Sequence, residues 1–275
     1  MRPTCWRPRR RLADSLATAC ISVLQCSNPR EKLMVARQVT RDWRLGRIDH
    51  RFDALPPDRP ARPDQPELLP PHQMPRRGKG GSERARIAMI HALAHIEFVA
   101  IDLAFDLVAR FGDGFPRDFA DDWLKVGADE AMHFALLDRR LNELGSHYGA
   151  LPAHDGLWEA ATDTAHDVAA RLAIVPMVLE ARALDITPQT IVRFESFGDA
   201  KTARILTRIV RDEVIHVAAG TKWFHWAVNR VGANPQKTYQ NLVRAHFRGA
   251  LKPPFNDSAR GQAGLTRDFY EPLAG

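Results

Sequence analysis

The chain has 275 residues, of which 45% are hydrophobic and 26% are charged, and its formal net charge is +6. This length suits one large domain or two small ones, and the apolar content is enough to bury a sizeable core. No run of eighteen or more apolar residues is present, so we expect no membrane-spanning helix. The cysteines, Cys5, Cys20 and Cys26, are odd in number and form no C-x-x-C motif, which favours a reducing, cytoplasmic location without a disulfide framework.

The positive charge is concentrated in the first third of the chain. Residues 1–86 hold 19 Lys and Arg against 9 Asp and Glu, a balance of +10, whereas residues 87–275 hold 20 against 24, a balance of −4. A basic segment of this kind can face nucleic acid, anionic lipid or an acidic partner, and it is also typical of a solvated arm. We favour the arm, and we interpret the Arg-rich start as the beginning of a helix rather than a transit peptide.

Residues 1–52 predict this helical arm. Two helices are expected between residues 10 and 48. At the start of the second helix, Ser27 or Asn28 suits the N-cap and Pro29 suits the first turn.

Residues 53–81 interrupt the helical pattern. They hold eight prolines, so they cannot form a helix, and they predict a linker or a strap laid over the rest of the chain. No β-hairpin signal is present anywhere in the sequence. Residues 233–275 are expected to be a C-terminal extension whose last part is irregular and covers a surface.

Residues 82–232 predict a bundle of four long helices. In the first helix, apolar residues recur at steps of three and four from Ile87 to Val108, which is the period of an α-helix, and a G-D-G turn ends it. The second helix begins at Pro116 and stops near Gly145.

The third helix is expected from about residue 158 to 184, with a kink at Pro176. A break and a short helix that begins at Pro188 should follow, and the fourth long helix is expected over residues 199–231. The predicted fold class is therefore all-α, a four-helix bundle with two extra N-terminal helices and a proline-rich strap.

Two stretches, ADEAMHFALL and RDEVIHVAAG, share the motif D-E-x-x-H. On a helix, residues at i and i+3 project from one face, so Glu130 lies beside His133 and Glu213 lies beside His216. The residues one turn away from both glutamates are apolar. A buried carboxylate without a partner is very unfavourable, so each pair needs a cation or a strong partner. One such pair is common by chance, but two in a predicted bundle favour a metal site.

Metal-binding bundles of this kind add one carboxylate from each of the other two helices. Glu97 lies in the apolar stripe of the first helix, and Glu180 lies in that of the third. Glu97 and Glu130 are 33 residues apart, and so are Glu180 and Glu213. The midpoint of the first pair falls in the G-D-G turn, which brings both residues to one level of an antiparallel pair. The midpoint of the second pair lies near Phe197, beyond the expected break.

The predicted metal ligands are four carboxylates and two imidazoles: Glu97, Glu130, His133, Glu180, Glu213 and His216. Two divalent cations would neutralise the four negative charges. Oxygen ligands with some nitrogen suit iron(II) or manganese(II), whereas zinc prefers fewer ligands and often sulfur. We expect Asp129 and Asp212 to accept a hydrogen bond from the ligand histidine of the facing motif and so to fix the orientation of its ring.

The sequence resembles the ferritin-like di-iron carboxylate superfamily and, more closely, a bacterial branch of it with no assigned function. The resemblance covers residues 29–231 and is carried by the motifs AHIEFVAIDLAFDLVARF, DDWLKVGADEAMHF, PAHDGLWE, VPMVLEARALDITP and RDEVIHVAAGTKWF. It implies a four-helix bundle and the same six ligands. The superfamily includes ferroxidases, oxygen-activating oxidases and hydroxylases, manganese catalases and a tRNA-modifying hydroxylase, and the resemblance does not choose among them.

Several alternatives stay open at the level of the sequence. His95 or Asp102 could replace Glu97 as the ligand from the first helix, although the neighbours of Glu97 are the most apolar. The E-x-x-H pairs could instead lie on exposed helix faces. Arg182 and Arg211 lie beside predicted ligands, where they could form ion pairs, which we favour, or meet an anionic substrate.

Four hypotheses for function follow. The first is an oxidoreductase in which two Fe ions, with Mn as the alternative, react with dioxygen or peroxide and oxidise a small organic substrate. The second is a ferroxidase or metal-handling protein, and the third is an RNA-modifying hydroxylase, motivated by the basic N-terminal part. The fourth is an interaction bundle without metal. Nucleic acid is the less favoured partner, no membrane span is expected, and a homodimer is compatible with the sequence.

Overall fold

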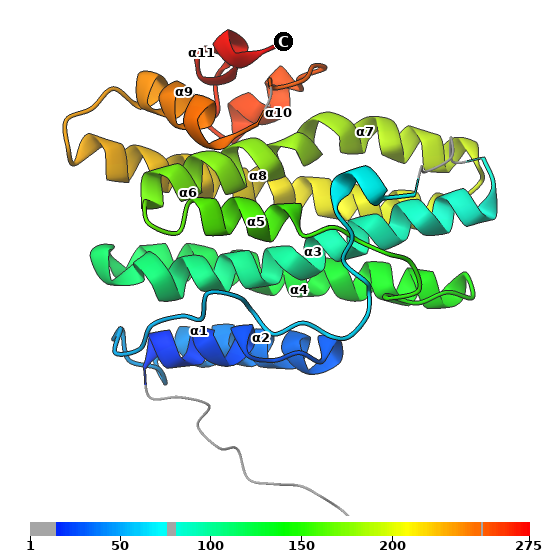
Figure 1. Cartoon of the computed structure of the whole chain (residues 1–275), viewed down its shortest axis with the longest axis horizontal. Coiled ribbons are helices and arrows are strands. Elements are labelled where there is room, and N and C mark those ends of the chain that lie inside the picture. The colour runs from blue at the N-terminus through cyan, green and yellow to red at the C-terminus, as the bar shows by residue number, and fades with distance from the viewer. Residues whose placement is uncertain (1–14, 76–80, 249) are drawn as a thin grey trace, which may run out of the picture.

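The computed structural model describes residues 15–75, 81–248 and 250–275. These residues form an all-α protein without strands, as predicted, and their only extended pairings are isolated β-bridges. The long helices pack side by side as in a bundle (Figure 1). The helices are α1 (Leu16–Leu24), α2 (Pro29–Arg44), η1 (Pro71–Gln73), α3 (Glu83–Phe111), η2 (Gly112–Gly114), α4 (Arg117–Glu143), α5 (Gly156–Asp163), α6 (Val168–Ile174), the π-helix η3 (Val175–Glu180), α7 (Ala181–Ser196), α8 (Ala200–Asn229), α9 (Pro235–His246), α10 (Asp257–Gln262), α11 (Arg267–Tyr270) and η4 (Glu271–Leu273).

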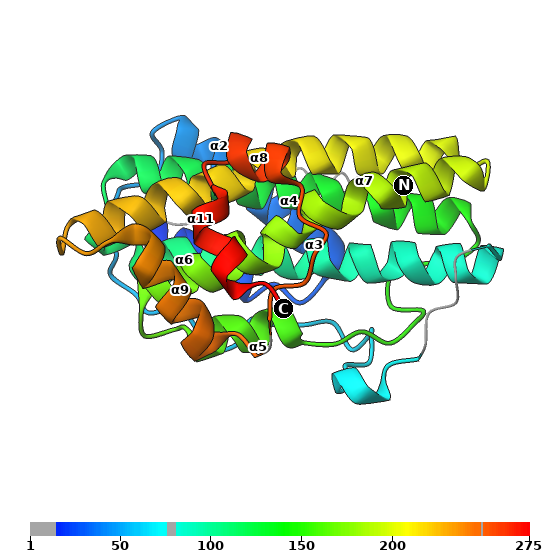
Figure 2. The same ribbon diagram turned by 90° about the horizontal axis from the view of Figure 1, so that it is seen from above.

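Four long rods form the centre of the molecule: α3, α4, the continuous α6–η3–α7 rod, and α8. The short turn η2 joins α3 to α4, which pack along one another, and α7 packs along α8 in the same way. The two pairs meet where α4 contacts α8, and Figure 2 shows the rods from above. One continuous apolar cluster runs through them. Polar side chains inside this cluster therefore need partners within the protein.

The N-terminal arm packs on the first helix pair, α1 against α3 and α2 against α4. Asn28 is the N-cap of α2, and its side chain accepts a hydrogen bond from the backbone N–H of Glu31. Pro29 occupies the first turn, as the sequence predicts. The first helix begins at Leu16, and its expected start near residue 10 lies outside the described residues.

The proline-rich segment lies across the arm and the bundle as a strap, residues 53–75, which can be followed in Figure 1. The backbone N–H of Ala61 donates to the carbonyl of Leu24 at 2.7 Å. The indole N–H of Trp158 on α5 donates to the carbonyl of Asp58 at 3.3 Å. These contacts tie the strap to α1 at one point and to α5 at another.

The third rod does not begin as one helix from residue 158, which corrects the sequence prediction. A separate short helix, α5, comes first and is followed by a break before α6. The hydroxyl of Thr164 donates back to carbonyls of α5, and the side chain of Asp167 accepts from the N–H of Ala169 and caps α6. Such side-chain bonds to the backbone compete with helix continuation.

Pro188 lies inside α7 and does not begin a helix, so the break expected near Asp185 is wrong. Proline lacks an N–H and leaves the carbonyl four residues earlier, that of Leu184, without its helical donor. The side-chain amide of Asn256, from the C-terminal extension, donates to that carbonyl at 3.1 Å. Because a distant residue replaces the lost bond, α7 continues to Ser196.

The C-terminal extension is more regular than expected, since it contains α9, α10 and α11. It folds back over α7 and α8 (Figure 1). Arg260 of α10 forms a buried, bidentate ion pair with Asp185 of α7, with N–O distances of 2.8 and 2.7 Å. Helices this short are stabilised by their packing rather than by their own sequence, so periodicity does not reveal them.

Among the described residues, one stretch, Glu83–Gly114, is long and apolar enough to cross a membrane by length and composition alone. It contains α3, and the sequence analysis missed it because polar residues interrupt the apolar run. The fold buries 67% of its most apolar window. A core helix of a bundle passes the same test, so this finding is weak evidence for a membrane span.

Candidate metal centre

Three rods bring four metal-ligating side chains together in the middle of the bundle. α3 supplies one glutamate, α4 supplies a glutamate and a histidine, and α8 supplies one glutamate. One ligand atom of each lies within 4.8 Å of the others, and all four residues are buried. The group consists of Glu97, Glu130, His133 and Glu213. Such a group could hold a metal ion.

The helix connections explain why these residues meet. The turn at Gly112–Gly114 lies midway between Glu97 and Glu130, so both residues reach the same height of the α3–α4 pair. The turn between α7 and α8 falls at residues 197–199, which is midway between Glu180 and Glu213. In the sequence, the midpoint of Glu180 and Glu213 lay beyond the break expected near Asp185, and the structure has no break there.

His133 is held between the carboxylates and an aspartate of the facing helix. Its Nδ1 lies 3.2 Å from a carboxylate oxygen of Glu97 and 3.4 Å from one of Glu130. On the other side of the ring, Nε2 donates to Asp212 at 3.0 Å. The aspartate next to Glu213 therefore orients the histidine of the other motif, which is the arrangement that the repeated D-E-x-x-H pattern predicts.

His216 occupies the corresponding place on α8. Its Nδ1 lies 2.9 Å from Glu130 Oε1 and 3.4 Å from Glu213 Oε1, and its Nε2 lies 3.6 Å from Asp129 Oδ2. The first distance is short, yet the angles do not make it a hydrogen bond, and 3.6 Å is too long for one. Among the described residues, neither ring nitrogen of this fully buried histidine has a hydrogen-bond partner.

Glu180, the predicted ligand from the third rod, lies on the edge of the same group. It lines one cavity together with Glu97, Glu130 and Glu213. Its Oε2 is inaccessible to solvent and also lacks a hydrogen-bond partner in the part of the chain that the structure describes. Unpartnered buried polar atoms are rare and require an explanation, and a missing ion is one of the usual ones.

The electrostatics of the group show strong crowding of negative charge. Burial and the charge of Glu130 raise the pKa of Glu97 well above its usual value, and burial and the charge of Glu213 do the same for the pKa of Glu180. Although burial opposes it, hydrogen bonds to Glu130 and Glu97 raise the pKa of His133 to about 11. Protons thus take the place of other cations when no metal is bound, and a metal ion has to displace them.

The two alternative ligands on α3 have other partners. His95 contacts the hydroxyl of Tyr148 at 2.9 Å and the carbonyl of His154 at 3.2 Å. Asp102 is fully buried in ion pairs with Lys32 of α2 and Arg62 of the strap. Of the three candidates on this helix, the structure places only Glu97 in the group.

Two cations that accompany the aspartates were not predicted from the sequence. Lys125 donates to Asp129 at 3.1 Å, and Arg208 donates to Asp212 at 2.7 Å. Each cation comes four residues before its aspartate on the same helix, a spacing typical of helical ion pairs. In both motifs a basic residue stands four positions before the Asp of D-E-x-x-H, and this repeated pattern could have predicted the two ion pairs.

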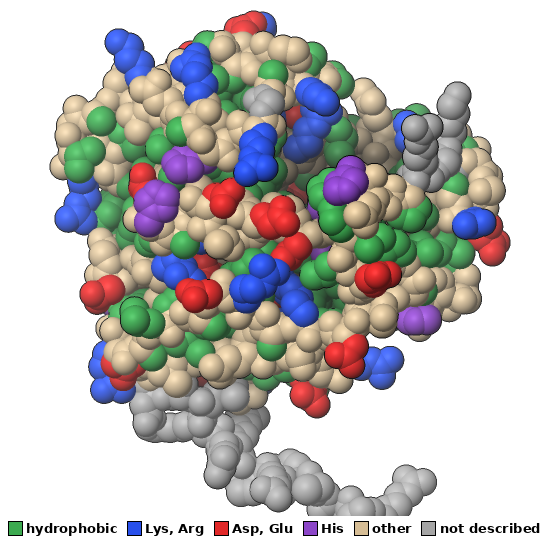
Figure 3. All heavy atoms as spheres, in the orientation of Figure 1, with side chains coloured by type: hydrophobic (Ala, Val, Ile, Leu, Met, Phe, Trp, Pro, Cys, Tyr) green, Lys and Arg blue, Asp and Glu red, His purple; other side chains and the backbone are tan. Residues whose placement is uncertain are grey.

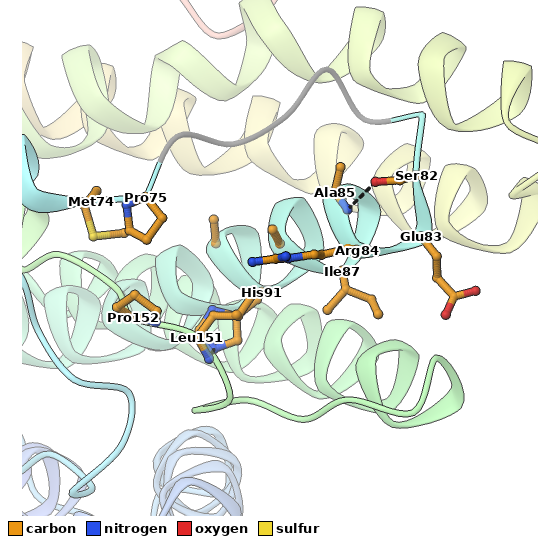
Figure 4. A pocket seen from close by; sticks show the side chains of 12 residues that line it. Met74, Pro75, Ser82, Glu83, Arg84, Ala85, Ile87, His91, Leu151 and Pro152 are labelled. Carbon is orange, nitrogen blue, oxygen red and sulfur yellow. Dashed lines mark hydrogen bonds between the residues drawn. The ribbon is translucent and has the colours of Figure 1, made fainter.

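A cavity of about 140 Å³ reaches the carboxylates. Apart from the four glutamates, Arg182 and Thr187, its walls are aliphatic side chains of α3, α5, η3, α7 and α8. A larger cavity of about 460 Å³ lies beside the first turns of α3, and Met74, Pro75 and His91 are among the residues that line it (Figure 4). None of the clustered glutamates lines it. The smaller cavity is therefore the one connected to the candidate metal centre.

Fold and site together define a helical protein with a buried carboxylate and histidine cluster that could hold metal. The chain belongs to the DUF455 family, whose description is "protein of unknown function", and the match covers residues 25–271. It is similar to an uncharacterized protein of Haemophilus influenzae, with 36% identity over 257 residues, and the match covers 90% of this chain and 89% of the relative. No solved structure matches the chain significantly.

Proposed function

We propose that the cluster is a dinuclear metal centre of the ferritin-like type and that two Fe ions, or two Mn ions, occupy it. The observation that carries this proposal is that, within the part of the chain that the structure describes, the buried ring nitrogens of His216 and the Oε2 of Glu180 have no hydrogen-bond partner, although they lie beside carboxylates already crowded together. The proposed ligands are those predicted from the sequence: Glu97, Glu130, His133, Glu180, Glu213 and His216.

The residues present fit such a pair of ions. Four carboxylates contribute four negative charges, which two divalent cations balance. A donor set of oxygens with two imidazole nitrogens suits Fe(II) or Mn(II) better than zinc. The Nδ1 atoms of both histidines face the carboxylates, while their Nε2 atoms face Asp212 and Asp129. An aspartate that accepts a hydrogen bond from the ring, as Asp212 does from His133, fixes the orientation of a metal-binding histidine.

We further propose an oxidoreductase that acts on a small organic substrate. When bound, the metal pair would supply the redox chemistry with dioxygen or peroxide. The chain's own residues would hold the metals, orient the two imidazoles and exclude bulk water. The aliphatic walls of the 140 Å³ cavity support an organic substrate, because a site that handles only metal ions gains nothing from them.

Two alternatives from the sequence analysis have less support. A ferroxidase would use the same ligands but has no need of the apolar cavity. An RNA-modifying hydroxylase needs a basic surface, yet Lys32, Arg59 and Arg62 of the N-terminal part are paired with aspartates of the same chain, and Lys32 is fully buried. On the face shown in Figure 3, positive and negative side chains are interspersed. The cytoplasmic location, the homodimer and the four-part domain division stay predictions.

The test of the metal centre is metal content. We expect anaerobically iron-loaded protein to hold about two Fe per chain and to change its absorption on exposure to oxygen. The double variant Glu130→Ala/Glu213→Ala removes one carboxylate from each motif and should lose most of the iron. A matched control, Glu159→Ala/Glu195→Ala, removes two exposed carboxylates on α5 and α7 and should keep it.

The decisive measurement is elemental analysis of all three proteins after removal of loosely bound metal. Unchanged iron in the Glu130/Glu213 variant, or no metal in the wild type after loading, would show that the proposed centre does not exist. Oxidation of iron without formation of any organic product, across a panel of small substrates, would favour the ferroxidase alternative.

A further inference from the structure

The 140 Å³ cavity has a floor and a mouth. At the floor lie Glu97, Glu130 and Glu213, whose relative exposures are 6%, 1% and 4%. At the mouth lie Ile96 and Ile186, which are 42% and 41% exposed. Between them the walls are aliphatic side chains. A molecule that enters from solvent therefore crosses an apolar passage before it reaches the carboxylates.

Of the Lys and Arg side chains that the structure describes, only Arg182 lines this cavity, and it lies at the mouth with 37% of its side chain exposed. Its Nη1 donates to the carbonyls of Lys252 and Pro254 in the C-terminal extension, at 2.6 and 3.2 Å. The same atom lies 3.4 Å from Asp185. Among the described residues, every hydrogen bond of this guanidinium uses Nη1, so the remaining N–H groups can bind another acceptor.

The ion pairs around Asp185 join two guanidinium groups to one carboxylate, which leaves a net positive charge on these three groups. Asp185 is fully buried and already forms two short hydrogen bonds with Arg260. Its contact with Arg182 is long by comparison. Two guanidinium groups thus share one carboxylate. The bidentate pair with Arg260 already satisfies the carboxylate of Asp185. The charge of Arg182 is therefore available to an anion that enters the cavity.

We infer that the cavity accepts a small carboxylic acid with a compact apolar body, whose carboxylate is bound by Arg182 at the mouth while its apolar part points towards the clustered glutamates. This inference rests on the proposed function, because it assigns the substrate class of the same site. It makes Arg182 a residue that positions substrate and determines specificity.

The volume of the cavity limits the apolar body. A cavity of about 150 Å³ accommodates benzene, so 140 Å³ corresponds to one six-membered ring or a short branched chain. Long acyl chains and polar sugars are excluded, the first by volume and the second because aliphatic walls offer no hydrogen bonds. Benzoate-sized acids fit both the volume and the charge.

Binding of matched probes tests the inference without any need for turnover. The probes are 4-fluorobenzoate and its neutral counterpart 4-fluorobenzyl alcohol, titrated by calorimetry into the metal-loaded protein. The variant Arg182→Gln removes the charge, and Arg182→Lys keeps it. Arg193→Gln, which alters an exposed arginine of the same helix, is the matched control.

We expect the wild type and the Arg193→Gln control to bind the anion more tightly than the alcohol. Arg182→Gln should weaken binding of the anion about ten-fold, as expected for loss of one charge-assisted hydrogen bond, and should change binding of the alcohol less than two-fold. Arg182→Lys should retain most of the preference for the anion. Thermal melts of each variant show whether the contact with the C-terminal extension is maintained.

Three results would overturn the inference: no binding of either probe to the wild type, unchanged anion affinity in Arg182→Gln, or equal weakening of both probes. A lysine variant as weak as the glutamine variant would also count against it. Metal content is measured on the same samples. If the wild type binds no metal, the proposed function is wrong. If it binds metal but shows no preference for the anion, only the role of Arg182 is wrong.

Discussion

At the scale of single residues, the loop that precedes α5 depends on one neutral histidine. His91 of α3 is almost fully buried, and its Nε2 accepts hydrogen bonds from the backbone N–H groups of Gly149 and Leu151 at 3.0 and 3.4 Å. An accepting nitrogen has to be unprotonated. Burial and the charge of His147 lower the pKa of His91 to about 4.

This arrangement predicts a loss of stability in mild acid. Because the folded-state pKa lies below the unfolded value of about 6.5, the unfolded chain takes up more protons as the pH falls. The contribution of His91 is complete above about pH 7 and decreases through the window between pH 6.5 and 4, and the loss has reached about 2 kcal/mol at pH 5. His91→Gln keeps an acceptor but does not titrate, so urea unfolding between pH 7 and 5 should show a flatter decline. Equal declines in both proteins would contradict this role.

At the scale of helices, the position of Glu180 depends on how closely α8 approaches the third rod. Around Pro176, where the sequence predicts a kink, the structure has the π-helix η3, which ends at Glu180. A Cβ on Gly220 of α8 would lie 2.5 Å from Cβ of Pro176 and 2.7 Å from its Cγ. The absence of a side chain at residue 220 therefore permits this contact.

Gly220→Ala should push η3 away from α8. We expect a destabilisation of about 1–3 kcal/mol, typical of overpacking, and reduced metal content, because Glu180 moves with η3. Gly114→Ala is the matched control, since a Cβ there would meet nothing within 4 Å. The measurements are the free energy of unfolding and bound iron per chain. If both variants matched the wild type, the close approach of the helices would not be what positions Glu180.

At the scale of the whole molecule, a buried group of charges joins the arm, the strap and the bundle. Lys32 of α2 and Arg62 of the strap both pair with Asp102 of α3, and neither Lys32 nor Asp102 is exposed. Burial lowers the pKa of Lys32, and the charge of Asp102 opposes that shift. The three segments are far apart in sequence, so these pairs exist only when the arm and strap are in place.

Lys32→Met should leave Asp102 with one cation where it now has two. Removing one partner of a buried pair typically costs about 3–5 kcal/mol of stability. Because Arg62 still pairs with Asp102, we expect this variant to lose about 3 kcal/mol, the low end of that range. Arg30→Met, an exposed change on the same helix, is the control. Chemical unfolding of both variants measures the difference. A loss below about 0.5 kcal/mol, the range of ordinary surface changes, would mean that the charges do not hold the arm.

The sequence by itself determined the helical class, the arm and strap, the turn between α3 and α4, and the residues that form the cluster. These features follow from local rules: helical periodicity, caps, proline content and the equal spacing of the two Glu and E-x-x-H pairs. The tertiary structure decided what depends on distant partners. Asn256 lets α7 pass Pro188, Lys32 and Arg62 take Asp102 away from the cluster, and the C-terminal helices cover α7 and α8. No local pattern encodes these contacts, because each depends on which segments the folded chain brings together.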